Sequence, residues 1–93
     1  MMKITMPVEA GNAAIKDGSM AKIMADALER LKPEAAYFLT ENGARTALMV
    51  IDLADPADIP STVEPFFTGL NAAVQLTPVM NADDLNKGLS TIS

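Results

Sequence analysis

The chain contains no cysteine and no histidine. Without cysteine it can form no disulfide, offers no thiolate nucleophile and binds no metal through sulfur. Without histidine it lacks the commonest general base and the commonest metal ligand of proteins. Aromatic residues are also scarce, with no Trp, one Tyr and three Phe, so Leu, Ile, Val, Ala and seven Met must fill the core. These absences exclude the most familiar catalytic and metal-binding signatures, and we expect neither a metal nor a cofactor.

Basic residues are few as well, since 7 Lys and Arg stand against 12 Asp and Glu, a net charge of −5. A nucleic acid or an anionic membrane surface would need clustered cations, so we expect neither as a partner. The charge is most simply explained as a means of staying soluble. No apolar run approaches the roughly 20 residues of a membrane-spanning helix, and the N-terminus lacks the apolar stretch of a secretory signal. We therefore expect a cytoplasmic protein.

The length of 93 residues is that of one domain, and we treat residues 1–93 as a single unit. A domain of this size buries only about 60–65% of the surface that its unfolded chain exposes. An interface with another chain would therefore add useful stability.

The first third of the chain predicts a strand, a loop and a helix. Residues 2–8 alternate as a strand does, although Pro7 cannot donate a hydrogen bond to a neighbouring strand. Residues 9–19 contain Gly11, Asn12, Gly18 and Ser19 and predict a long loop with at most one helical turn. Residues 20–31 carry apolar side chains at helical spacing, and Ser19 is the expected N-cap.

The middle of the chain predicts a β-hairpin. Two β-prone runs, residues 35–39 and 45–53, flank the dipeptide Asn42-Gly43. A type I′ turn needs two residues that tolerate positive φ, and Asn-Gly supplies them. We therefore expect an antiparallel pair of strands here.

The segment 54–71 predicts a second helix, because apolar residues recur at helical spacing. Asp55 and Pro56 suit its N-cap and first position. Pro65 should kink this helix or make it restart.

The last quarter of the chain predicts a strand and a short helix. Residues 73–80 form the strand, and Asn81 then caps a helix at about 82–87 that Gly88 ends. Residues 89–93 should be loose unless a partner holds them.

The predicted order is strand, helix, strand, strand, helix, strand, followed by the short helix. This is the α+β, ferredoxin-like βαββαβ arrangement, a four-stranded antiparallel sheet with both helices on one face. The run 47–53 is apolar on both sides except at Asp52. Either Leu48 and Val50 or the alternating pair Met49 and Ile51 must therefore face away from the helices. Contact with a second copy, sheet on sheet, would cover that face. We therefore predict a homodimer through the open sheet face.

Several blocks of the sequence support a resemblance to a known group of proteins. They are Lys32–Phe38, Asp52–Pro56 with Ile59-Pro60, Glu64–Phe67, Asn71-Ala72, and Pro78–Met80 with Asp84-Leu85. Together they resemble a group of small stand-alone bacterial proteins of uncharacterised function in the dimeric α+β-barrel superfamily. In that superfamily two ferredoxin-like protomers join their sheets back to back.

The resemblance spans nearly the whole chain and implies a bacterial homodimer. Members of the superfamily include cofactor-independent monooxygenases, muconolactone-isomerase-like enzymes and small proteins with no known activity. The resemblance carries over no catalytic residue. It therefore leaves the question of enzymatic activity open, with a non-enzymatic role favoured.

Three side chains are candidates for catalysis: Tyr37, Arg45 and Glu64. A phenol, a fixed cation and a carboxylate could orient and protonate a small polar substrate, with Glu64 as base if burial raised its pKa. The simpler interpretation is that Tyr37 anchors the core, Arg45 pairs with a hairpin acid and Glu64 is solvated.

Two other constellations have simpler explanations. Asp52, Asp55 and Asp58 supply oxygen ligands, but their spacing matches no calcium loop and helix capping explains two of them. The loop at 11–19 could act as a lid, although it has no phosphate-binding pattern. An RNA-recognition fold and a metal chaperone are excluded by the missing basic, aromatic and cysteine residues. An amino-acid-sensing regulatory domain stays open.

These observations favour a small homodimer with a non-enzymatic binding or accessory role, whose ligand, if it has one, is a small organic molecule. The alternative is a cofactor-independent monooxygenase, isomerase or lyase that uses Tyr37, Arg45 and Glu64 in a pocket between sheet and helices.

Overall fold

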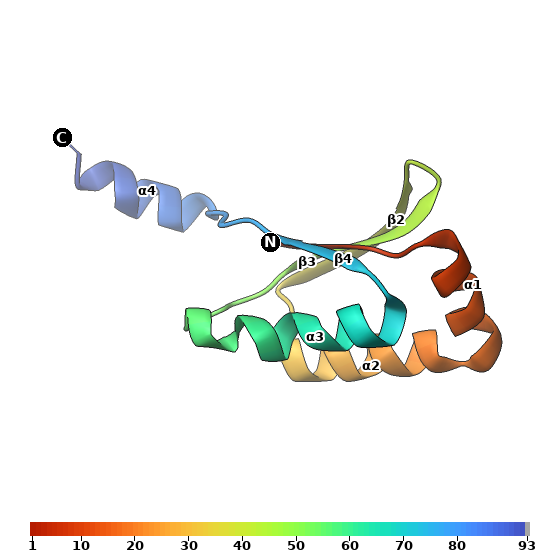
Figure 1. Cartoon of the computed structure of the whole chain (residues 1–93). Helices are drawn as coiled ribbons and strands as arrows, with labels where there is room; N and C mark the ends of the chain where they lie inside the picture. Colours follow the sequence, from red (N-terminus) through yellow and green to blue (C-terminus); the bar gives the residue numbers. More distant parts are fainter. Residues whose placement is uncertain (93) are drawn as a thin grey trace.

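The computed structural model describes residues 1–92. Its elements are β1 (Met2–Thr5), α1 (Val8–Asp17), α2 (Ser19–Leu31), β2 (Ala35–Glu41), β3 (Ala44–Val50), the 3₁₀ helix η1 (Pro56–Asp58), α3 (Ile59–Leu70), β4 (Ala73–Leu76) and α4 (Ala82–Ser90). The four strands form one antiparallel sheet in the order β2-β3-β1-β4. Helices α1, α2 and α3 lie on one face of this sheet, while α4 extends beyond its end (Figure 1). The predicted ferredoxin-like α+β fold is confirmed.

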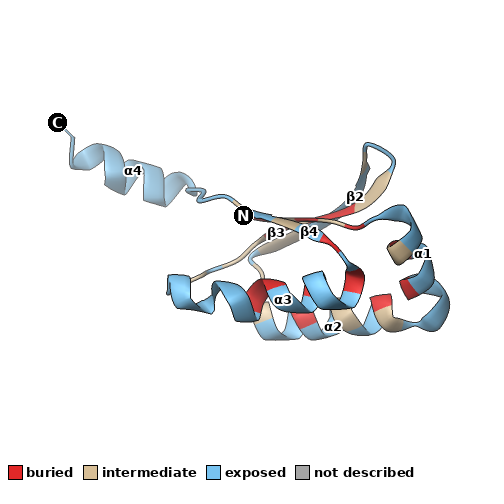
Figure 2. Cartoon of the chain, in the orientation of Figure 1, coloured by how far each residue is buried: buried red, intermediate tan, exposed pale blue. Residues whose placement is uncertain are grey.

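The core lies between the sheet and its three helices. Met2 and Ile4 of the central strand β1 pair with Met49 and Ala47 of β3, and all four side chains are fully buried. Phe66 closes the core from α3 and is also fully buried. The buried residues gather between these layers, and α4 has none (Figure 2). One face of the sheet therefore carries nearly all of the packing.

The hairpin forms as predicted. Asn42 and Gly43 both have positive φ, 52° and 76°, as a type I′ turn requires. A two-residue turn fixes the register, so Thr40 lies opposite Arg45 and Tyr37 lies opposite Leu48. The second strand ends at Val50, three residues earlier than expected.

The loop predicted for residues 9–19 is wrong, because this segment forms helix α1. Glycine lowers helix propensity, but Gly11 is buried, and a Cβ there would lie 2.9 Å from Nη1 of Arg45. The glycine therefore leaves room for the guanidinium of Arg45 beside α1. Gly18, with φ of 81°, then turns the chain directly into α2.

The start of α2 also differs from the prediction, since Ser19 is its first residue and not its cap. The amide of Ser19 donates to Oδ1 of Asp17 at 2.8 Å. Hydrogen bonds from the hydroxyl and then the amide of Ser19 lower the pKa of Asp17. Asp17, the last residue of α1, thus accepts from the first amide of α2, whose N-cap is Gly18.

The second helical region is divided into η1 and α3. Asp55 caps η1 as predicted, because its Oδ1 accepts from the amide of Ala57 at 2.9 Å. Pro65 lies inside α3 and cannot donate to the carbonyl of Ser61, four residues earlier. Nη1 of Arg30 on α2 donates to that carbonyl instead, at 3.1 Å. A contact between helices thus compensates for the proline.

Two predicted ends near the C-terminus need correction. Strand β4 ends at Leu76, not at residue 80. Asn81 caps α4 as predicted, within a capping box in which its Oδ1 accepts from the amide of Asp84 at 2.8 Å and Oδ2 of Asp84 accepts from the amide of Asn81 at 3.2 Å. Gly88 does not end this helix, which continues to Ser90. Of the tail expected to be loose, the last residue lies outside the described part.

Two neighbouring phenylalanines of α3 allow the position of the core to be tested. Phe66 is fully buried and Phe67 is 41% exposed. We expect Phe66→Ala to lower the free energy of unfolding by about 3–5 kcal/mol, or to abolish the cooperative transition, because it leaves a cavity. Phe67→Ala, the matched control, should cost much less. Urea unfolding followed by circular dichroism measures both variants. Equal losses of unfolding free energy would contradict the position of Phe66 in the core.

Candidate functional site

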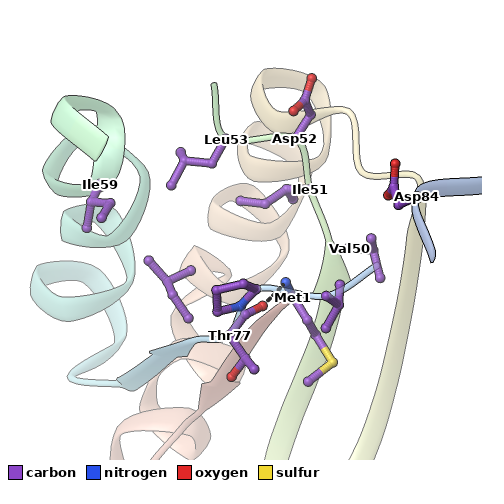
Figure 3. A pocket seen from close by; sticks show the side chains of 11 residues that line it. Met1, Val50, Ile51, Asp52, Leu53, Ile59, Thr77 and Asp84 are labelled. Atoms are coloured by element: carbon purple, nitrogen blue, oxygen red, sulfur yellow. Dashed lines mark hydrogen bonds between the residues drawn. The ribbon is translucent and has the colours of Figure 1, made fainter. Parts of the chain in front are cut away.

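A pocket of about 520 Å³ opens at the end of the sheet where β3 and β4 finish. Its lining consists of Met1, Val50, Ile51, Asp52, Leu53, Ile59, Leu76, Thr77, Pro78, Val79 and Asp84. These residues come from the N-terminus, the last residues of β3 and β4, the chain after each of these strands, the start of α3 and the first turn of α4 (Figure 3). The volume lies within the usual range for small-molecule sites, roughly 300–1,000 Å³.

Reciprocal hydrogen bonds hold the wall of the pocket where the N-terminus meets the chain after β4. The terminal ammonium of Met1 donates to the carbonyl of Thr77 at 2.6 Å, and the amide of Thr77 donates to the carbonyl of Met1 at 2.9 Å. Pro78 follows and has no amide to continue the pairing with β1. The chain therefore leaves the sheet at this point, and a hollow remains beside the last paired residues.

The chemistry of the pocket is mainly apolar. Side chains of Ile51, Leu53 and Ile59 gather on one side of it, while the carboxylate of Asp52 points away from them (Figure 3). The lining contains no basic side chain, and its terminal ammonium already donates to Thr77. Such a site suits a small apolar molecule held by packing.

The three catalytic candidates lie elsewhere. Tyr37 is 67% exposed on the face of β2 that points away from the helices. Arg45 lies on the opposite face of the sheet, where its Nη1 donates to Oδ1 of Asn12 at 3.0 Å. Glu64 is exposed on α3. None of the three lines the pocket, and within one protomer the phenol and the guanidinium are on opposite sides of the sheet.

The other constellations are also explained by local structure. Asp55 caps η1, and across residues 1–92 no three acidic side chains lie close enough together to hold a metal ion. The lid expected at 11–19 is replaced by α1 and Gly18, and α1 lies at the other end of the sheet from α4 (Figure 1). No helix in the described chain is long and apolar enough to cross a bilayer.

The second notable surface is the sheet face away from the helices, which we call the open face. By register it comprises Lys3, Thr5, Ala35, Tyr37, Leu39, Glu41, Ala44, Thr46, Leu48, Val50, Ala73 and Gln75. Leu48 and Val50 are thus the apolar pair that points away from the core. One ion pair, Lys3 with Glu41, lies on this face. Within residues 1–92, no helix covers the open face (Figure 1).

The pocket lies where the sequence pattern predicts that both flanking strands continue. Residues 51–53 and 77–79 leave the sheet and line the pocket instead. The available signals were the prolines at 56 and 78, which disfavour regular pairing nearby.

Comparison with protein-family models, with curated proteins and with solved structures finds no match to this chain. The resemblance to the dimeric α+β-barrel superfamily therefore stays a prediction.

The pocket can be tested with a neutral solvatochromic dye such as Nile red. We expect the wild-type protein to bind it and Val79→Asp to lower the affinity about tenfold or more, because a carboxylate is placed in an apolar wall. Val8→Asp is the matched control, since Val8 is 53% and Val79 48% exposed, and only Val79 lines the pocket. Equal affinities of both variants by fluorescence titration would show that the dye binds elsewhere.

Proposed function

We propose that this protein is a homodimer that associates through its open faces and binds a small, mainly apolar organic molecule without transforming it. The observation that carries the proposal is the open face itself. Tyr37 is 67% and Leu39 39% exposed there, beside the half-buried Leu48 and Val50. A contiguous apolar surface of this kind on a small domain typically marks an interface.

The sizes of the side chains favour one arrangement of the two sheets. A two-fold axis along the strands places β2 of each protomer over β4 of its partner. The large Tyr37 and Leu39 then lie over the smaller Ala73 and Gln75. An axis across the strands would set β2 against β2 and leave Ala73 facing its own copy. Because packed sheets interlock large side chains with small ones at a separation of about 10 Å, we favour the first arrangement.

Binding is better supported than catalysis by the chemistry of the pocket. Catalysis needs a base, an acid or a nucleophile placed against the substrate, with a partner to hold it. The carboxylates in the lining are those of Asp52 and Asp84; Asp52 points away from the apolar wall, and Asp84 accepts a hydrogen bond from Asn81 in the capping box of α4. We therefore propose an accessory or carrier role in the cytoplasm.

The dimer can be tested with two adjacent aromatic residues of β2. Tyr37 lies on the open face and Phe38 on the other side, and both are well exposed, at 67% and 58%. We expect Tyr37→Asp to raise the dissociation constant of the dimer at least about 100-fold, because it would bury an unpaired charge. Phe38→Asp should leave the dimer intact.

Light scattering coupled to gel filtration measures both variants and the wild type. A wild-type mass near 9.8 kDa, that of one chain, at micromolar concentration would overturn the dimer. Equal dissociation by both variants would instead indicate association along the edge of β2.

A further inference from the structure

The charged side chains that line the pocket are all of one sign. Asp52 and Asp84 are acidic, and no lining residue is Lys or Arg. The terminal ammonium of Met1 is the cation of this wall, and it already donates to the carbonyl of Thr77 at 2.6 Å. The lining therefore has an excess of negative charge, which bears on the kind of ligand that the pocket takes.

Neither carboxylate of the lining is neutralised by an ion pair. The salt bridge found within residues 1–92 joins Lys3 and Glu41 on the open face. In the same part of the chain Asp52 accepts no hydrogen bond, and Asp84 uses one oxygen, Oδ2, for the amide of Asn81. Oδ1 of Asp84 and both carboxylate oxygens of Asp52 can therefore accept hydrogen bonds from a ligand.

The two carboxylates are set apart from the apolar wall of the pocket. In Figure 3 the carboxylates of Asp52 and Asp84 both point toward the top of the view, and the side chains of Ile51, Leu53 and Ile59 gather below Asp52. Both acidic residues are exposed. A ligand whose apolar body packs on the two isoleucines and the leucine can therefore keep a polar end in water near the carboxylates.

We propose that the pocket takes an apolar molecule that carries a positively charged amine, with the hydrocarbon part against the apolar wall and the ammonium beside Asp52 and Asp84. Opposite charges attract the ammonium there, whereas a ligand with a carboxylate is repelled. Because both acidic residues are exposed to water, each changes the affinity about two- to fivefold. This inference names the class of ligand and rests on the binding function proposed above.

Displacement of bound Nile red by octylamine, octanol and octanoate tests this preference, because the three compounds differ mainly in the charge of one end. We expect octylamine to displace half of the dye at a concentration about fivefold below that of octanol, and octanoate at one about threefold or more above it. Equal concentrations for all three compounds would overturn the preference and leave the pocket in place. Failure of the wild type to bind Nile red would instead overturn the proposed binding function, and this inference with it.

A pair of double variants identifies the groups responsible for the preference. Asp52→Asn/Asp84→Asn should bring octylamine to the half-displacement concentration of octanol and leave octanol itself unchanged, since asparagine keeps an acceptor oxygen for the amide of Asn81. Asp26→Asn/Asp83→Asn is the matched control, because it removes the same charge from two exposed residues outside the lining. It should keep the wild-type preference. An equal loss of preference in the control would assign the effect to the net charge of the chain and overturn the role of the two lining carboxylates.

Discussion

The structure depends on one constraint: a four-stranded sheet has two faces, and the three helices packed on it cover only one. Met2, Ile4, Ala47 and Met49 use that face to build the core, and all are fully buried. The same strands expose a second row that includes Leu48 and Val50. With one layer of helices the chain cannot bury both rows. Burial of apolar area is the main favourable term in folding, so the uncovered row leaves stabilisation that only another molecule can supply.

Much of the fold could be predicted from the sequence, because several local signals agree with the final packing. The Asn42-Gly43 turn, the apolar stripe of α2 and the capping box of α4 each depend on neighbours along the chain. Helix α1 could not be predicted in this way. Gly11 lowers its local propensity, and the side chain that lies against it, Arg45, comes from a strand more than thirty residues away. Contacts between distant segments also explain why Pro65 is tolerated within α3, through Arg30.

The three candidate catalytic residues show a second limit of prediction from the sequence. Side-chain chemistry alone makes Tyr37, Arg45 and Glu64 candidates, and it does not say which face of the sheet each residue occupies. The register of the hairpin predicts which faces Tyr37 and Arg45 occupy. A two-residue turn at 42–43 sets Thr40 opposite Arg45, and because sides alternate along a strand, Tyr37 must lie on the other face. The pocket is harder to predict from the sequence. It lies where the strands end but the apolar residues continue, so the sequence pattern does not mark the end of the sheet.

The pocket borders the open face, because Val50 belongs to both. This has a thermodynamic consequence for the proposed function. If association through the open face orders Val50, a ligand binds the dimer more tightly than the monomer. Ligand binding then shifts the association equilibrium toward the dimer, and association raises ligand affinity by the same factor. The open face and the pocket thus take part in one coupled equilibrium. In such a system the ligand affinity depends on the protein concentration, whereas at a site that association leaves unchanged it does not.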